Sequence, residues 1–270
     1  MIRADLHSHT KCSHGLATAG EMLATAAETG LDYFAISEHS PLPPGYGCAL
    51  YTGDLERDFP LLIRELVEMK RHKPGLLLGL ELDWTPSAHA WMRDIVSSAP
   101  FDHVLGSLHF LDGKSVGNPA SWPASLSRAE HFERFEAYYY EMASMCKSGL
   151  INIASHPDFI KIRVFELFHE WLDSPEAEKA IFSALVAMKK HDVALEINSA
   201  GLRQPFREMY PCSKIMRLAK QARVNISFGS DAHRPEDIAA AFEEARLWAM
   251  RHGYTDYVVY FKGRPRSFKL

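Results

Sequence analysis

Seven short, β-rich apolar runs alternate with helical patterns along the 270 residues, and this alternation limits the possible folds more than any other feature. The runs cover residues 2–6, 33–38, 76–82, 103–109, 151–155, 193–198 and 224–230. Helical patterns cover residues 18–29, 54–72, 90–98, 127–147, 174–191, 212–222 and 235–251. Such alternation is typical of a parallel α/β sheet, either a barrel or an open doubly wound sheet. Residues 255–262 predict an extra strand or a C-terminal staple.

The composition narrows the class of protein. Hydrophobic residues make up 47% of the chain, which is ample for one core, so we expect a single domain over residues 1–270. The formal net charge is −4 and no basic run stands out, which argues against a nucleic-acid partner. No signal-peptide pattern or membrane-length apolar stretch is present, and the four cysteines are scattered. These features predict a cytoplasmic protein with no membrane partner.

Each predicted strand ends in histidine or carboxylate side chains. In a parallel barrel the C-terminal strand ends meet at one mouth, so these side chains should converge in space. Imidazole nitrogen and carboxylate oxygen suit zinc, iron or manganese. The candidate ligands are His7, His9, His14, His39, Glu81, His109, His156, Asp231 and His233. They outnumber the roughly four to six donors that one ion needs, which favours a site with several ions.

Other polar residues have simpler interpretations. A single histidine at a strand end is more often a hydrogen-bonded residue than a ligand, so the hypothesis depends on the repeated position. We expect solvated side chains at His72, His89, His131, His169, His191 and His252. His103 precedes the apolar part of its run and should lie at the other end of the barrel. Asp5 is expected to orient a ligand imidazole. For Asp83 and Glu196 we leave both an orienting and a structural role open.

The polar strand ends resemble those of the PHP (polymerase and histidinol phosphatase) family. The matching segments are DLHSHT (5–10) with His14, SEH (37–39), GLELD (79–83), GSLHF (106–110), SHPD (155–158) and SDAH (230–233). Residues 101–119, 196–205 and 260–270 resemble the histidinol-phosphatase branch of that family. Glu38 departs from the pattern, because many relatives have aspartate there.

The resemblance implies a distorted seven-stranded (β/α)7 barrel of TIM-like shape, with the active site at the C-terminal ends of the strands. It also implies three divalent transition metal ions, which could be zinc, iron or manganese. One ion would be bound by His7, His9, Glu81 and Asp231. A second would share Glu81 and add His109 and His156. The third would be bound by His14, His39 and His233. Glu81, Asp231 and His233 are the expected catalytic residues.

The reaction expected from this resemblance is hydrolysis of a small-molecule phosphate monoester, with L-histidinol phosphate the favoured substrate. A hydroxide bridging two metal ions would attack phosphorus. Arg203 is the first candidate for an additional phosphate contact, Lys161 the second and Arg163 a weaker one. The long loops 40–53 and 111–125 could cover the rest of the substrate.

Two alternatives remain open at this point. The first is another metal-dependent phosphoesterase or amide hydrolase on the same barrel, which would differ only in its substrate-contacting loops. The second is a non-catalytic metal-binding or assembly module. The complete set of candidate ligands argues against the second alternative.

Overall fold

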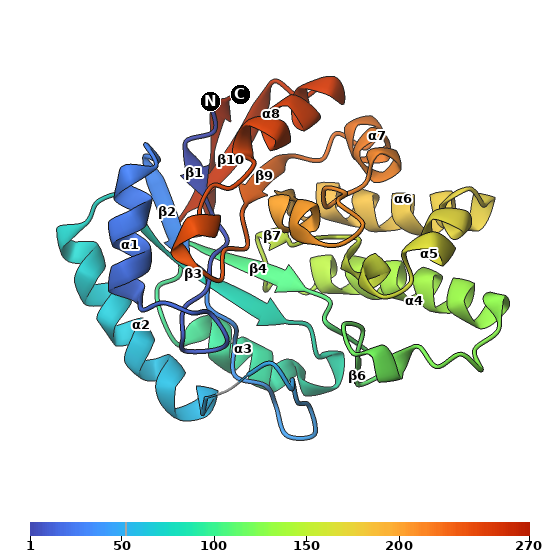
Figure 1. The fold of residues 1–270 in the computed structure, drawn as a ribbon, viewed down its shortest axis with the longest axis horizontal. Coiled ribbons are helices and arrows are strands. Elements are labelled where there is room, and N and C mark those ends of the chain that lie inside the picture. The colour runs from blue at the N-terminus through green and yellow to red at the C-terminus, as the bar shows by residue number, and fades with distance from the viewer. Residues whose placement is uncertain (52) are drawn as a thin grey trace.

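The computed structural model describes residues 1–51 and 53–270, and its parallel strands form a nearly closed barrel (Figure 1). Within the described chain, seven strands follow one another in the order β1-β2-β3-β4-β7-β8-β9. They are β1 (Ala4–Asp5), β2 (Tyr33–Ile36), β3 (Leu76–Asp83), β4 (His103–Ser107), β7 (Ile153–Ala154), β8 (Ala194–Asn198) and β9 (Ile226–Gly229). The strands lie side by side in the order in which they occur along the chain, whereas in a doubly wound sheet the strand order reverses part-way. The barrel expectation is therefore confirmed.

Closure between the first and last strands runs through the segments that carry the candidate ligands. The Leu6 amide donates to the Phe228 carbonyl at 3.1 Å. Just beyond the strand ends, the Asp231 amide donates to the His7 carbonyl at 2.8 Å, and the His9 amide donates to the Ala232 carbonyl at 2.9 Å. The backbone that closes the barrel is therefore the same backbone that positions His7, His9 and Asp231.

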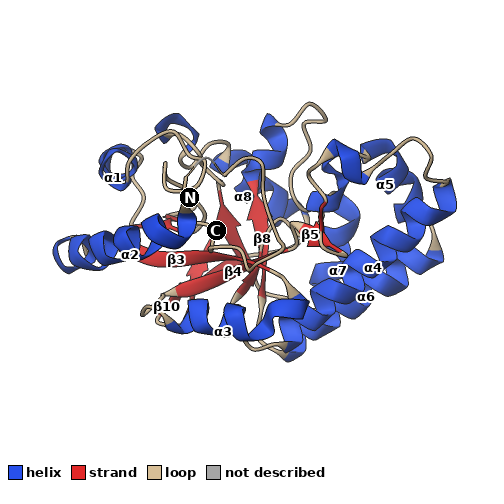
Figure 2. Cartoon of the chain, turned by 90° about the horizontal axis from the view of Figure 1, so that it is seen from below, coloured by secondary structure: helices blue, strands red, loops and turns tan. Residues whose placement is uncertain are grey.

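Helices form an outer layer around the strands (Figure 2). They are α1 (Ala19–Glu28), α2 (Leu55–His72), α3 (His89–Ser97), α4 (Arg128–Lys147), α5 (Phe165–Leu172), α6 (Pro175–Lys190), α7 (Ser213–Gln221) and α8 (Phe242–Arg251). Thr18 and Ser127 cap α1 and α4 through capping boxes. The sequence analysis missed α5, which is only eight residues long. Among the helices of the described ranges, none is long and apolar enough to cross a membrane.

The helix predicted over residues 235–251 begins later than expected. Pro235 starts only a short 3-10 turn (Pro235–Asp237), and α8 begins at Phe242. Between them, Ala239 and Ala241 have positive φ angles of 55° and 57°, which interrupt a helix. The Ala239 amide donates to the Asp5 carboxylate at 3.0 Å. The chain therefore leaves the helical path where it binds a buried carboxylate of β1.

The C-terminal residues form an antiparallel hairpin outside the barrel sheet. It consists of β10 (Asp256–Phe261), which the sequence predicted, and β11 (Arg264–Lys269), which its charged residues concealed. The Tyr257 hydroxyl accepts from the Arg3 amide at 3.1 Å, and the two termini lie side by side in Figure 1. A second hairpin, β5 (Phe110–Leu111) with β6 (Lys114–Ser115), follows β4.

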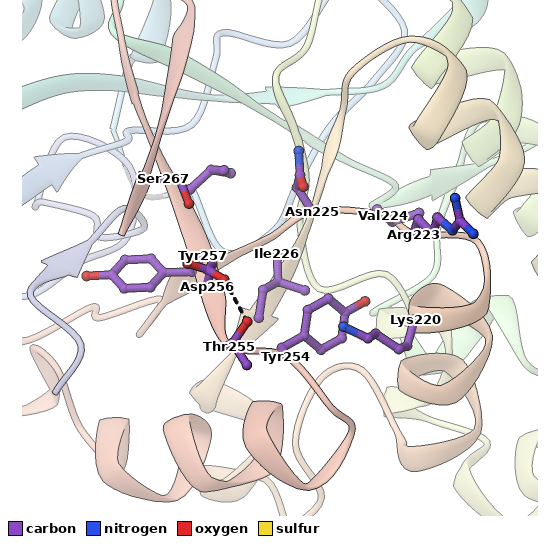
Figure 3. A pocket seen from close by; sticks show the side chains of 11 residues that line it. Lys220, Arg223, Val224, Asn225, Ile226, Tyr254, Thr255, Asp256, Tyr257 and Ser267 are labelled. Atoms are coloured by element: carbon purple, nitrogen blue, oxygen red, sulfur yellow. Dashed lines mark hydrogen bonds between the residues drawn. The ribbon is translucent and has the colours of Figure 1, made fainter. Parts of the chain in front are cut away.

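A cavity of about 210 Å³ lies between the C-terminal hairpin and the end of α7 (Figure 3). Lys220 lies over the Tyr254 ring in this cavity, with Nζ 4.8 Å from the ring centroid. The cavity is next to Ile226, where β9 begins, so it lies at the opposite end of the barrel from the candidate ligands.

His103 lies at the start of β4, away from the strand ends that carry the ligands, as the sequence predicted, and its ring is buried in the interior. Its Nε2 atom lies 2.9 Å from the Leu6 carbonyl oxygen and 3.1 Å from Ser37 Oγ. Gly79 of β3 makes room for the ring, since a Cβ at this position would lie 2.8 Å from Nε2 and overlap Ser37 Oγ. Burial lowers the pKa of His103 to about 4 and outweighs the opposing effect of the Leu6 carbonyl.

We expect His103 to make the fold sensitive to acid. The unfolded chain binds this proton with a pKa near 6.5 and the folded chain with a pKa of about 4. The stabilising contribution is therefore complete above pH 6.5 and is lost as the pH falls through this interval. In urea unfolding of the metal-free protein, the free energy of unfolding of His103→Gln should fall less steeply with acid than that of the parent. If the free energy of unfolding fell equally steeply with acid in both proteins, the lowered pKa of His103 would be contradicted.

Candidate metal centre

Three histidines from different strand ends gather on one side of the barrel mouth. The His14 ring centroid lies 5.0 Å from that of His39 and 4.2 Å from that of His233. The His9 ring lies next to the same group, 4.3 Å from His39 and 4.4 Å from His233. The short segments after β1, β2 and β9 therefore bring together the three residues expected to bind one ion.

Glu81 lies at the centre of the candidate ligands. Its side chain is 1% exposed, and imidazole nitrogens surround both carboxylate oxygens at 2.9 to 3.6 Å. These imidazoles belong to His7, His9, His39, His109 and His156. Asp231 approaches from the end of β9, with Oδ1 3.3 Å from His9 Nε2 and 3.8 Å from His7 Nε2. The structure thus brings all nine sequence-predicted ligands into one cluster.

Both central carboxyl groups remain ionised. Burial acts to raise the pKa of Glu81, but the charges of His39, His7 and His109 outweigh it and hold the pKa well below its ordinary value. Burial likewise opposes ionisation of Asp231, but the charges of His7, His233 and His9 hold its pKa well below the ordinary value. Two buried negative charges therefore require positive charge close by.

Buried carboxylates on the outer side of the cluster orient several of its imidazoles. The pairs, each joined through Nδ1 of the imidazole, are Glu196–His7 at 2.7 Å, Glu38–His9 at 3.4 Å and Asp83–His109 at 2.7 Å. When Nδ1 donates to a carboxylate, the lone pair of Nε2 is left to face the centre. For Asp83 and Glu196, which the sequence left open, the contacts favour the orienting role.

The expectation that Asp5 orients an imidazole is wrong. The Asp5 carboxylate accepts from the backbone amides of His7 at 3.3 Å and Ser230 at 2.9 Å. The Asp5 carboxylate therefore holds the backbone where β1 meets β9 and does not contact the His7 ring. Glu196, on β8, orients that ring instead.

The cluster fits divalent metal ions. Seven of its buried donor atoms have no hydrogen-bond partner among the described residues. They are Nε2 of His7, His9 and His233, Nδ1 of His14, His39 and His156, and Oε2 of Glu81. One unpaired buried polar atom costs about 1–3 kcal/mol. Seven such atoms in one place fit a bound cation, which accepts their lone pairs. Ligand atoms of His9, His39 and His233, and of Glu81, His109 and His156, lie within 4.8 Å of one another in sets that could hold a cation.

A substrate would approach the cluster from its exposed side. The His109, Asp231 and His233 side chains are 16%, 17% and 28% exposed, whereas His7, His9 and Glu81 are almost completely buried. Arg203 lies beside the exposed side and donates to the backbone carbonyls of Ser230 at 2.7 Å and Asp231 at 3.0 Å. Because its side chain is 30% exposed, the guanidinium retains donors for an anion.

The other two cations named by the sequence analysis have protein partners. Lys161 is completely buried, and its ammonium donates to Asp158 at 2.8 Å, Glu208 at 2.6 Å and the Met209 carbonyl at 3.2 Å. These contacts use all three of its hydrogens. Arg163 donates through Nε to the Gly117 carbonyl at 2.6 Å. A phosphate contact from Lys161 stays a prediction. Because its ammonium hydrogens are engaged by protein partners, Arg203 is the better candidate for that contact.

Sequence reasoning missed aromatic residues that line the cluster. The Phe159 ring centroid lies 4.9 Å from that of His156 and 5.1 Å from that of His109. The Tyr51 ring lies 5.0 Å from His39. Tyr51 comes from a loop and Phe159 from a short 3-10 helix (Phe159–Ile162), where an aromatic side chain carries no periodic signal, so nothing in the sequence distinguished them.

One of the histidines expected in solvent is buried. His131 is 6% exposed, its ring stacks on Trp122 at 5.7 Å, and its Nδ1 lies 2.9 Å from the Ser127 carbonyl. The first turn of α4 packs against the loop that contains Trp122, so the side chain faces inward. His72, His89 and His191 are exposed, as expected, and His169 and His252 are half-buried.

Comparison with known families shows the family to which the chain belongs. Residues 5–200 match the model of the PHP domain. The chain belongs to the PHP domain family. This PHP chain is 30% identical over 245 residues to a Deinococcus radiodurans protein described as a probable histidinol-phosphatase, covering 89% of this chain and 90% of that one. It is 25% identical over 272 residues to the histidinol-phosphatase of Bacillus subtilis, covering 90% and 98%.

A solved structure shares the PHP fold. The crystal structure of histidinol phosphate phosphatase from Lactococcus lactis, complexed with zinc, L-histidinol and phosphate, matches this chain with a TM-score of 0.78. The match covers 98% of both chains at 19% sequence identity. It therefore confirms the fold across nearly the whole length.

In this PHP barrel, Gly229 leaves room for the central residues of the cluster. A Cβ at Gly229 would lie 2.5 Å from His7 Cβ and would overlap Glu196 Oε1. We therefore expect Gly229→Ala to displace the Glu196–His7 pair, to lower the bound metal measured by elemental analysis, and to cost about 1–3 kcal/mol of stability. Gly20→Ala in α1 is the control, because the nearest atom to its added Cβ is 4.0 Å away. Equal metal content in both variants would contradict the expectation.

Proposed function

We propose that this PHP protein is a metal-dependent phosphate monoester hydrolase whose substrate is L-histidinol phosphate. The observation that carries the proposal is the buried cluster around Glu81, with unpaired imidazole and carboxylate donors and one exposed side. The names of the Deinococcus and Bacillus relatives support the substrate, because each alignment covers most of both chains. The four free cysteines are consistent with a reducing compartment, so we keep the cytoplasm as the proposed location.

The donor set suits three divalent ions. The proposed ligand sets are His7, His9, Glu81 and Asp231 for the first ion, Glu81, His109 and His156 for the second, and His14, His39 and His233 for the third. Nitrogen and oxygen donors of this kind accept zinc, iron and manganese, and the cellular supply of each metal selects among them. Elemental analysis of the purified protein identifies the ions and their number.

The roles of the side chains follow from charge and exposure. Bound divalent cations would neutralise phosphoryl oxygens and lower the pKa of a bound water. Glu81 and Asp231 supply the negative charge that retains cations in the buried centre. Asp231 and His233, on the exposed side, lie where a phosphate would enter. Arg203 would donate N–H groups to a phosphate oxygen from the rim, and no protein nucleophile is needed.

The proposed function predicts two losses of activity. Removing the metal with a chelator should abolish hydrolysis of L-histidinol phosphate, and restoring divalent ions should recover it. His9→Ala should lower turnover by at least about 100-fold, because it removes a central ligand. The measurement is phosphate release from a panel that includes L-histidinol phosphate, nucleotides and p-nitrophenyl phosphate. Unchanged turnover by His9→Ala would contradict the metal mechanism, and preference for another ester would contradict the substrate.

We expect Arg203 to affect substrate binding without affecting the metals. Arg203→Met should lower kcat/KM for L-histidinol phosphate by about 10- to 100-fold, the size expected for one lost hydrogen bond to a charged group. Metal content should stay at the parent level, because the guanidinium donates to backbone carbonyls and not to a candidate ligand side chain. Arg207→Met, an exposed cation on the same segment, should behave like the parent. Equal kinetics of both variants would exclude Arg203 from the site.

A further inference from the structure

Tyr51, in the segment between β2 and α2, lies beside the metal centre. Its ring centroid lies 5.0 Å from that of His39 and 5.6 Å from that of His14. Its hydroxyl donates to Asp83 Oδ2 at 3.1 Å. Tyr51 is half-buried, and its ring covers this side of the cluster.

Asp83 is the residue through which this contact reaches the candidate ligands. Its Oδ1 accepts from His109 Nδ1 at 2.7 Å, and its Oδ2 lies 3.8 Å from His39 Nδ1. One carboxylate therefore faces imidazoles that the proposed function assigns to two different ions. With Nδ1 of His109 engaged, Nε2 points toward Glu81 Oε1, 3.6 Å away.

A carboxylate held at one oxygen can still rotate about its side-chain bond. For Glu196, the second oxygen is fixed by hydrogen bonds from the His156 amide at 2.8 Å and the Asn198 amide group at 3.0 Å. For Glu38, the second oxygen accepts from the Thr10 amide at 2.9 Å and the Thr10 hydroxyl at 2.6 Å. Asn198 belongs to β8, and Thr10 and His156 lie in the short segments just after β1 and β7. For Asp83, the donor to the second oxygen is Tyr51, from a loop outside the barrel.

We propose that Tyr51 is a positioning residue of the metal centre, which fixes Asp83 so that His39 and His109 each present a nitrogen to their own ion. This inference rests on the proposed function, because it takes His39 and His109 as metal ligands. It gives the loop 40–53 a role in assembling the site. The side chain that covers the cluster would therefore also help to set the positions of the ligands of two ions.

The test removes the hydroxyl and keeps the ring. Tyr51→Phe should release metal to a chelator about 10-fold faster than the parent, the lower end of the effect seen when a partner beyond the direct ligands is lost. The cobalt-substituted variant should show an altered visible absorption spectrum. The melting temperature of the metal-free protein should not change, because the ring packing is preserved. Turnover of p-nitrophenyl phosphate should fall mainly in kcat.

Tyr46→Phe is the matched control. Tyr46 lies in the same loop, but its hydroxyl lies 2.9 Å from Ser87 Oγ and its ring packs against Phe110 at 5.2 Å. This variant should match the parent in metal release and in spectrum. A double-mutant cycle with Asp83→Asn gives a second test, because Tyr51→Phe should add almost nothing once the carboxylate through which Tyr51 acts has been replaced.

The outcomes separate this inference from the proposed function. If the parent binds no divalent ion, the proposed function fails and the role of Tyr51 fails with it. If the parent binds ions and Tyr51→Phe releases them at the parent rate with the parent spectrum, only the role of Tyr51 is overturned. The role of Tyr51 would also be overturned if the effects of Tyr51→Phe and Asp83→Asn on metal release were fully additive. A lower melting temperature of metal-free Tyr51→Phe than of the metal-free parent would overturn it as well.

Discussion

The contact between the Glu81 carboxylate and the surrounding imidazoles is the interaction on which the rest of the structure depends. A buried charge is tolerated only beside opposite charge, and here its neighbours come from the ends of β1, β2, β4 and β7. The hydrogen bonds that close the barrel run through the same ends, from Asp231 to His7 and from His9 to Ala232. The same backbone segments therefore close the barrel and carry the cluster.

The cluster also distinguishes the mouth of the barrel from its interior. At the C-terminal ends of the strands, polar side chains are left with unpaired donors, which is costly unless a ligand completes them. Below them, His103 at the start of β4 fills the interior, and its Nε2 atom bonds with the Leu6 carbonyl and Ser37. The mouth is therefore the end of the barrel that is suited to chemistry, as in parallel barrels generally.

Much of this arrangement was predictable because parallel strands impose a simple rule. A side chain that follows a strand must lie at the mouth, so His39 and His156 could be placed from the sequence alone. Partners far apart in the sequence could not, because no local pattern joins Glu196 to His7, which are separated by 189 positions in the chain. The late start of α8 was missed for the same reason, since a buried carboxylate on β1 diverts Ala239. Loop aromatics such as Tyr51 carry no periodic signal.

The most direct test of the central claim is anomalous X-ray diffraction from crystals of the metal-loaded protein, recorded at the zinc, iron and manganese absorption edges. The account predicts three anomalous peaks in the cluster, with oxygens of Glu81 and Asp231 and the imidazole nitrogens at about 2.0–2.3 Å from them. A cluster without anomalous density, in which the imidazoles and carboxylates bond only to one another, would contradict it.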